Sequence, residues 1–223
     1  MPPAAKPLRA PQVDEELEPA SADAVEHDAR LRGVLLAGAD LADRHASGVS
    51  IAASRLEDVD LAGATLDELS LTDVVLERCN LANMRARRAH VRAAALTGAR
   101  MTGAALTEAD IADVTIRGCR LDLASFAAAR LERVAFEDCL MTQADFLEAS
   151  LRSVHFHGCD LSKLDLRGAR LVQCELRDCR LDGMEGVERL RGSAMPWADI
   201  LGAAGLWASA LGIDVLDRED GED

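Results

Sequence analysis

The sequence predicts a repeat protein whose structural unit is five residues long. Every fifth position from Leu31 to Leu181 is apolar without an insertion, and 29 of these 31 side chains are Leu, Ile, Val, Met or Phe. The two smaller side chains are Ala46 and Ala86. A period of five fits neither the 3.6-residue period of an α-helix nor the two-residue alternation of a flat strand. Such strict self-similarity is the signature of a repeat architecture.

A second column of small residues shows which other side chain of each unit points inward. The residue two positions before each large apolar one is small or apolar, as at Ala64, and only Arg44 and Ser54 are polar. We therefore expect two of every five side chains to face a core and three to face solvent. Because Arg44 and Ala46 disturb both columns in one unit, we expect an irregular first coil and a regular rod from about Val49.

The two columns together resemble the pentapeptide-repeat family, whose motif is A-(D/N)-L-x-x. Instances are VDLAG at 59–63, ADFLE at 144–148 and CDLSK at 159–163, and the resemblance covers residues 31–185. It implies an all-β solenoid, a right-handed quadrilateral β-helix in which four pentapeptides form one square coil. About seven to eight such coils fit in this region. The chain also resembles the topoisomerase-protecting members of the family in having a predicted C-terminal helix.

A period of twenty residues in the inward column supports four units per coil. One set spaced in this way is Val59, Cys79, Ala99, Cys119, Cys139, Cys159 and Cys179. Residues twenty apart should then stack at the interstrand spacing of about 4.8 Å, which gives a rod roughly 37 Å long. Phe126 falls below Phe146, and Phe136 falls below Phe156 on the opposite wall. This spacing suits stacked aromatic rings.

The segment before the repeat, residues 1–30, is predicted to be an arm and a short N-terminal cap. Residues 1–20 contain five of the six prolines and several charges, which predicts a disordered arm. Ser21–Arg30 is expected to form one short helix, N-capped by Ser21, across the first coil. No apolar stretch typical of a secretory signal follows Met1, and no apolar run is long enough to span a membrane. We therefore expect a cytoplasmic protein with no membrane partner.

The segment after the repeat, residues 186–223, is predicted to be a capping or dimerisation helix followed by an acidic tail. The helix should lie within 193–212, with Pro196 in its first turn and Gly212 at its end. Its apolar stripe comprises Trp197, Ile200, Leu201, Ala204, Trp207, Ala208 and Leu211. Two interpretations are open. The helix covers the free strand edges of the last coil, or it also forms a two-fold homodimer contact, as in several family members. Residues 214–223 are expected to be frayed.

The charge distribution argues against direct nucleic-acid binding, because the formal net charge is −14. The most acidic predicted wall has seven acidic and four basic residues. Its acidic members are Glu57, Asp58, Glu77, Glu137, Asp138, Glu175 and Asp178. The wall that carries Arg92, Arg130, Arg133, Arg152 and Arg170 is net +2. A basic knot at 85–92 (RARRAHVR) is either a solvated, ion-paired face or a contact point for an acidic partner.

No residue pattern predicts catalysis, a cofactor or a metal site. All six cysteines lie in the inward small column, which indicates packing rather than chemistry. His155 and His157 are both expected to point outward, without the further ligands that a metal needs. The sequence has no Gly-rich phosphate loop, nucleophile elbow or H-E-x-x-H motif. We therefore expect the protein not to be an enzyme.

Two functions fit these observations. The first is a protein-protein interaction scaffold, in which a rigid rod displays three side chains in five and the arm adds reach. The second follows from the resemblance: family members that protect or inhibit type II topoisomerases (gyrase) present a DNA-like acidic rod. A duplex of the rod's length would carry about 22 charges, whereas residues 31–185 have 24 acidic and 19 basic side chains. The scaffold is therefore the favoured interpretation.

Overall fold

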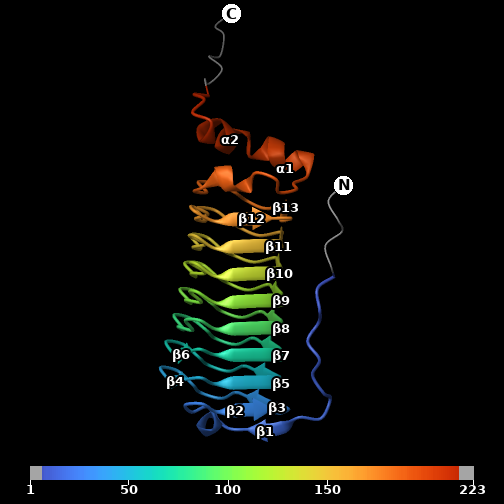
Figure 1. The fold of residues 1–223 in the computed structure, drawn as a ribbon, viewed down its shortest axis with the longest axis vertical. Coiled ribbons are helices and arrows are strands. Elements are labelled where there is room, and N and C mark those ends of the chain that lie inside the picture. The colour runs from blue at the N-terminus through green and yellow to red at the C-terminus, as the bar shows by residue number, and fades with distance from the viewer. Residues whose placement is uncertain (1–6, 216–223) are drawn as a thin grey trace, which may run out of the picture.

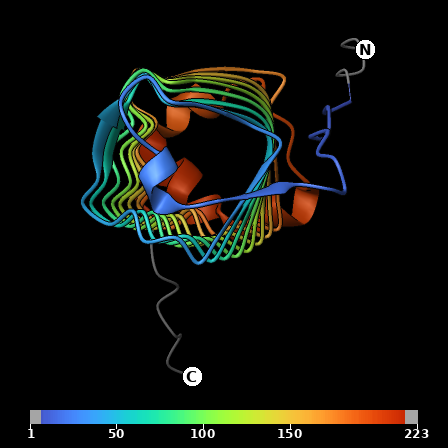
Figure 2. The ribbon, with the colours of Figure 1, turned by 90° about the horizontal axis from the view of Figure 1, so that it is seen from below.

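Parallel strands stacked into a four-sided rod make up most of the computed structural model, which describes residues 7–215 (Figures 1 and 2). The main ladder has the order β1-β3-β5-β7-β8-β9-β10-β11-β12, with β2 on β5 and β13 on β11. A short second ladder pairs β4 with β6. The predicted all-β solenoid with square coils and a C-terminal helical cap is confirmed.

The strands are β1 (Glu18–Ala20), β2 (Arg30–Arg32), β3 (Val34–Ala37), β4 (His45–Ser47), β5 (Ser50–Glu57), β6 (Thr65–Asp67), β7 (Ser70–Glu77), β8 (His90–Thr97), β9 (Asp110–Arg117), β10 (Arg130–Glu137), β11 (Ser150–His157), β12 (Arg170–Val172) and β13 (Glu175–Arg177). The helical elements are η1 (Ala22–Ala24) and η2 (Val187–Leu190), both 3-10 turns, and α1 (Trp197–Gly202) and α2 (Ala204–Ala210).

A register of twenty residues relates successive coils. Ile111 pairs with Leu131, and Leu131 pairs with Leu151. Isolated bridges such as Asp60 to Asn80 continue the same register on the sides that lack long strands. β5 and each strand from β7 to β11 span eight residues and so cover two adjacent sides of the square. The period-twenty prediction is confirmed.

A residue with positive φ at each corner explains why the period is five. The residue two positions after a large inward side chain has a left-handed backbone, as at Asp58 (φ 52°), Asp73 (φ 55°) and Arg133 (φ 55°). This conformation costs an ordinary residue roughly 1–2 kcal/mol. Hydrogen bonds between coils hold it in place: the Asp58 N–H, for example, donates to the Glu77 carbonyl at 3.0 Å. The local strain is thus offset by the stacking of neighbouring coils.

The two inward columns form one apolar core. Within residues 7–215 the buried polar side chains are Ser54 and Ser153. Ser54 Oγ accepts from the Val34 N–H at 3.1 Å and donates to the Ala52 carbonyl at 2.6 Å. The polar exception in the inward column is therefore satisfied.

The four phenylalanines fill the C-terminal half of this core. Phe126 stacks on Phe146 with ring centroids 4.9 Å apart, and Phe136 stacks on Phe156 at 5.1 Å. The two stacks meet edge to face at 6.2–6.3 Å, which is a favourable arrangement for aromatic rings. The predicted stacking on opposite walls is confirmed.

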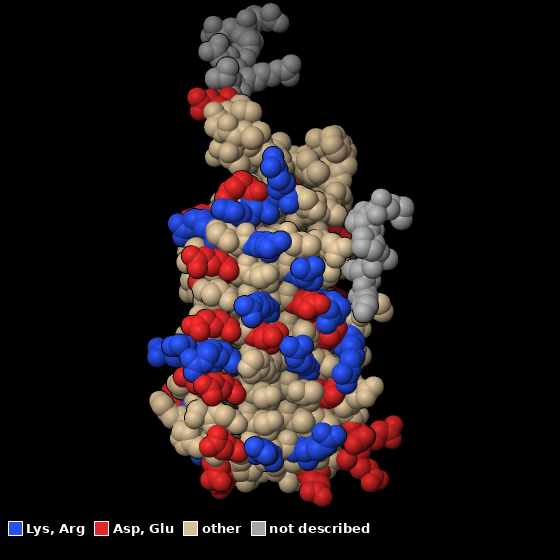
Figure 3. Space-filling view, viewed as in Figure 1, with Lys and Arg blue, Asp and Glu red and all other residues tan. Residues whose placement is uncertain are grey.

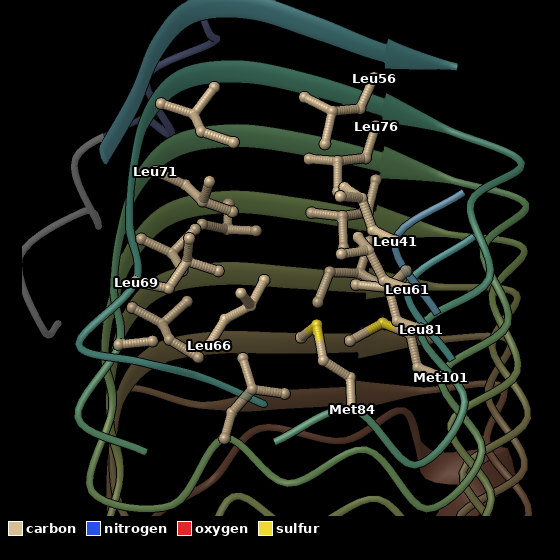
Figure 4. Close-up of a pocket in the computed structure, with 18 of the residues that line it drawn as sticks. Leu41, Leu56, Leu61, Leu66, Leu69, Leu71, Leu76, Leu81, Met84 and Met101 are labelled. Atoms are coloured by element: carbon tan, nitrogen blue, oxygen red, sulfur yellow. The ribbon is translucent and has the colours of Figure 1, made fainter. Parts of the chain in front are cut away.

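The N-terminal half of the core, which has no aromatic side chain, is packed less completely. An enclosed apolar cavity of about 60 Å³ runs between Val25 and Phe126. Figure 4 shows Leu61, Leu81 and Met101, one coil apart, and Met84, all directed into it. Its lining has no polar group, so the space has nothing to hold an ordered water molecule.

The N-terminal end differs from the prediction. The helix expected over Ser21–Arg30 is one 3-10 turn, η1, and the Ser21 side chain does not cap it. The chain instead continues the coil, because β1 pairs with β3 and Val25, 1% exposed, covers the end of the core. Residues 7–17, expected to be disordered, follow an extended path along the rod (Figure 1). Residues 1–6 of the predicted arm lie outside the described residues.

The first coil is less irregular than predicted. Ala46 is buried and belongs to β4, which pairs in register with β6. Arg44 is only partly exposed, and its carbonyl accepts from the Thr65 N–H of the next coil at 2.8 Å. The regular register of twenty residues therefore begins before Val49.

The predicted C-terminal helix consists of two short helices with a break at Ala203. Gly202 and Gly205 flank the break, and glycine is a poor helix former. Pro196 is the N-cap residue of α1 rather than part of its first turn, and Gly212 (φ 70°) ends the helical segment as predicted. Within residues 7–215, no helix is both long and apolar enough to cross a membrane. Residues 216–223 of the predicted frayed tail lie outside the described residues.

We predict that Cys139→Trp will disrupt one coil, because Cys139 is 0% exposed in the small inward column. Overpacking of this kind costs about 1–3 kcal/mol or more, and the cooperative thermal transition followed by circular dichroism should shift down or broaden. Cys139→Ala and Cys139→Val serve as controls and should have mild effects. A Cys139→Trp protein that melted like the parent would contradict the observed packing.

Candidate functional site: the acidic wall and the C-terminal cap

The predicted acidic wall lies on one side of the square, but its carboxylates fall into two groups. Glu57, Asp58 and Glu77 lie on adjacent coils at the N-terminal end of this side. The remaining four lie toward the C-terminal end and are Glu137, Asp138, Glu175 and Asp178. Between the groups the corresponding positions carry Thr97 and Arg117. The structure therefore does not form one continuous acidic stripe.

Most of these carboxylates are paired with a cation on the same wall. Arg78 lies 2.7 Å from Asp58, and Arg55 lies 3.7 Å from Glu57 and 3.4 Å from Glu77. The hydrogen bond from Arg78 lowers the pKa of Asp58.

The second group is paired in the same way. Arg117 contacts Glu137, Arg177 lies 2.7 Å from Glu175, and His157 Nε2 lies 3.4 Å from Asp178. Among the described residues, five of the seven carboxylates pair with an arginine, Asp178 lies beside a histidine that is charged only when protonated, and Asp138 has no ion-pair partner. The wall is thus closer to neutral than its acidic residues suggest.

The face of the rod in Figure 3 carries basic and acidic side chains interspersed. The wall that was predicted to be basic is also ion-paired. Arg133 pairs with Asp113 at 2.7 Å, and Arg92 pairs with Asp110 at 3.1 Å. The basic knot at 85–92 is also largely ion-paired, since Arg88 lies 2.6 Å from Glu68 and Arg87 lies 3.3 Å from Glu108. Within residues 7–215, Arg130, Arg152 and Arg170 have no such pair.

The C-terminal cap covers the end of the last coil. Ala203, Leu206 and Trp207 pack against the core, as does Met195. Trp207 Nε1 donates to the Ile200 carbonyl at 3.0 Å, which ties α2 to α1 across the break.

Hydrogen bonds from backbone N–H groups join this cap to the rod. The Asp178 N–H donates to Asp199 Oδ2 at 2.7 Å. The Ala194 N–H donates to the Cys174 carbonyl at 2.9 Å, and the Leu176 N–H donates to the Ala194 carbonyl at 3.0 Å. The last strand edge is therefore paired, which is how proteins protect an exposed sheet edge.

The predicted apolar stripe divides into a buried part and an exposed part. Trp207 and Ala208 are partly buried, whereas Trp197, Leu201 and Leu211 are 73%, 57% and 75% exposed. Ile200 and Ala204 are also exposed. The stripe was predicted for one continuous helix, and the break at Ala203 rotates its two halves relative to each other. Sequence reasoning also missed Leu206, although its spacing from Ala203 is typical of one helix face.

Exposed apolar side chains at this end extend beyond the helices. Ile213 and Val215 are 56% and 68% exposed. Beside α2 an open groove of about 960 Å³ is lined mainly by Val187, Leu190, Met195, Ile200, Trp207 and Leu211. Exposed apolar surface concentrated in one place is typical of an interaction site.

Among residues 7–215 no three His, Cys, Asp or Glu side chains are placed to hold a metal ion. All six cysteines are free thiols. Burial raises the pKa of Cys79 and Cys174, which keeps these thiols protonated and unreactive.

Comparisons with known proteins agree with this geometry. The family described as "Pentapeptide repeat region" matches residues 49–126 and 117–185. No curated protein matches the chain. A trypsin-treated variant of QnrB1, a plasmid-mediated fluoroquinolone resistance protein, has a similar solved structure, with a TM-score of 0.56 at 16% identity over 90% of this chain and 100% of QnrB1.

Two further solved structures match at comparable identity. A second trypsin-treated QnrB1 variant has a TM-score of 0.50 at 17% identity, over 84% of this chain and 100% of the other. HetL from Nostoc sp. strain PCC 7120, a pentapeptide repeat protein involved in heterocyst differentiation regulation, has a TM-score of 0.37 at 22% identity, over 75% and 90%. At these identities the likeness to the two QnrB1 variants concerns the fold alone.

We predict that the rod loses stability in acid as its paired carboxylates are protonated. Hydrogen bonds from Arg133 and Arg167 lower the pKa of Asp113 and Asp165. Their stabilising contribution is complete above the unfolded pKa of about 3.9 and is lost as the pH falls through the lower folded pKa. The urea midpoint should therefore be nearly constant from pH 8 to about 5 and fall below about 4.

Arg133→Gln should reduce this acid dependence, because Asp113 then loses its cationic partner. The control Arg130→Gln, which removes an arginine without an ion pair in the described residues, should leave it unchanged. A urea midpoint that does not fall between pH 5 and about 2.5 would contradict the assignment.

Proposed function

The chain belongs to the pentapeptide repeat family, and we propose that it is a non-enzymatic scaffold that binds a protein partner through the outer surface of its rod. The observation that carries this proposal is the division of side chains. The two inward columns are apolar and closed off, and the outward side chains are left for display. Function must therefore reside on the outer walls and at the ends.

The outer surface suits a partner that recognises its shape and the positions of individual charges rather than its net charge. Ion pairs cover the walls, and backbone bonds between coils fix the positions of these side chains. The interior cavity is too small and apolar to hold a polar substrate. We also propose a cytoplasmic location, which fits six free thiols.

We further propose that the cap forms a homodimer contact. Trp197, Leu201 and Leu211 are more than half exposed although they are large and apolar. Packing these side chains against a second copy around a two-fold axis removes that surface from water.

A type II topoisomerase is the second candidate partner. The likeness to QnrB1 extends over 100% of that chain and 90% of this one, and the sequence resembles the topoisomerase-protecting members of the family. Duplex DNA carries one charge per about 1.7 Å, whereas most carboxylates of the acidic wall here are ion-paired. Binding at a DNA site would therefore depend on the shape of the rod more than on its net charge.

The dimer proposal predicts that the parent sediments at twice its mass of 23.8 kDa. Leu201→Asp should give a folded monomer with the circular dichroism spectrum of the parent, because Leu201 is 57% exposed. Trp207→Asp is the contrasting variant and should lower the melting temperature, since Trp207 packs on the core. A parent that stays monomeric at about 50 μM would reject the contact.

The topoisomerase proposal predicts that the purified protein alters DNA supercoiling by a type II topoisomerase, measured with and without a fluoroquinolone. If the acidic wall is the contact, Glu137→Lys with Asp138→Lys should weaken the effect at least tenfold, and added salt should weaken the effect of the parent. Reversal of Arg130 and Arg152 to Glu is the matched control on the basic wall and should change little. A parent without any effect would reject this partner and leave the scaffold proposal standing.

A further inference from the structure

The extended segment at residues 7–16 lies along one corner of the rod (Figure 1). It has no regular secondary structure and none of its residues is buried. Neither the core nor the caps need it, because β1 and Val25 already close the N-terminal end. Its contacts with the rod nevertheless concentrate on two aspartates.

Arg9 and Gln12 make these contacts. Arg9 Nη2 lies 2.9 Å and 3.0 Å from the two carboxylate oxygens of Asp73. The Gln12 N–H donates to Asp73 Oδ1 at 3.1 Å, and the Arg9 N–H donates to Asp113 Oδ1 at 3.2 Å. The two aspartates therefore hold both the side chain and the backbone of an extended peptide.

The notch between the aspartates is formed by a small side chain. Asp73 and Asp113 are two coils apart in one corner column, and Ala93 lies between them in the same column. Ala93 is 2% exposed, and Ala53 and Ser153 of the same column are also buried, at 9% each. Ala93 therefore presents no long side chain that would obstruct a peptide lying between the two aspartates.

The surface beside the notch consists mostly of small or apolar side chains. Leu8, Ala10 and Pro11 line a shallow space together with Ala95, Leu96, Thr97, Thr115 and Arg117, whose charge is paired with Glu137. An extended peptide with small or apolar residues around an arginine therefore meets matching chemistry.

One carboxylate of the notch, that of Asp73, has a cationic partner only while an arginine lies in the notch. Asp113 is also held by Arg133 at 2.7 Å and 2.9 Å. Asp73 has Arg9 as its one ion-pair partner among the described residues. Asp73, whose side chain is 18% exposed, would lose that cation if the segment left.

The segment is held weakly enough to exchange. The Arg9 side chain is 55% exposed, and an exposed ion pair contributes about 0–1 kcal/mol. A segment with few buried contacts opens at low free-energy cost. Tethering provides an effective concentration in the millimolar range, which favours the chain's own segment over a weak competitor.

We propose that the notch formed by Asp73, Ala93 and Asp113 binds an extended, arginine-bearing segment of a partner protein, and that residues 8–12 of this chain occupy it until that partner displaces them. The inference rests on the scaffold function proposed above. It gives that scaffold one binding site and one class of ligand, an extended segment with an arginine. It does not depend on the identity of the partner or on dimerisation.

The first test measures release of the segment by amide hydrogen exchange in the full chain. Asp73→Ala should speed exchange at the Arg9 and Gln12 amides at least tenfold while exchange in β7 to β10 stays unchanged. Asp58→Ala is the matched control, because it removes a corner aspartate paired with Arg78 instead, and it should leave both amides unaffected. Unchanged exchange in Asp73→Ala would overturn the proposal.

The second test measures binding in trans with a labelled peptide that has the sequence of residues 8–13. Arg9→Glu in the full chain should release the segment by repulsion from Asp73 and allow the peptide to bind at least tenfold more tightly than it binds the parent. The peptide with its arginine replaced by glutamate should not bind, and Asp73→Arg added to the variant should abolish binding. Two outcomes would overturn the proposal. In the first, the peptide binds the parent and Arg9→Glu equally well. In the second, the peptide does not bind Arg9→Glu although the segment of this variant is shown to be released. Because no partner protein enters this experiment, its failure is distinguishable from failure of the proposed scaffold function.

Discussion

The stacking of each residue on the residue twenty positions later is the constraint on which the structure depends. It places the inward side chains one coil above another, so that Phe126 meets Phe146 at 4.9 Å. It also supplies the bonds between coils that hold a positive φ at corners such as Asp58 and Arg78. A single insertion would move every following side chain to another position on the square, which explains why the repeat has none between Leu31 and Leu181.

The same register determines the chemistry of the outer surface. Side chains on neighbouring coils lie close enough to pair, and Arg78 with Asp58, Arg117 with Glu137 and Arg133 with Asp113 are each twenty residues apart. Charges that look unbalanced along the sequence are therefore neutralised between coils. A partner meets a patterned surface of ion pairs, and this favours specific complementarity over long-range attraction.

The C-terminal end and one corner of the rod carry surface that does not belong to this pattern of ion pairs. The cap packs Leu206 and Trp207, both partly buried, against the core but exposes Trp197, Leu201 and Leu211. Asp73 and Asp113, which flank Ala93 in one corner column, hold the extended segment at residues 7–16. Both features lie outside the regular pattern of ion pairs between coils.

The sequence by itself determined the solenoid, its period and the identity of nearly every buried residue, because a strict period of five permits one assignment of inward and outward positions. It also located the acidic wall and the helical cap. The pairing of the wall's carboxylates was decided only by the tertiary structure, since an ion pair depends on which rotamers meet across 4.8 Å. The break at Ala203 and the docking of Arg9 on Asp73 were decided there too. In these segments local propensity is weak, and contacts with residues distant in sequence select the conformation.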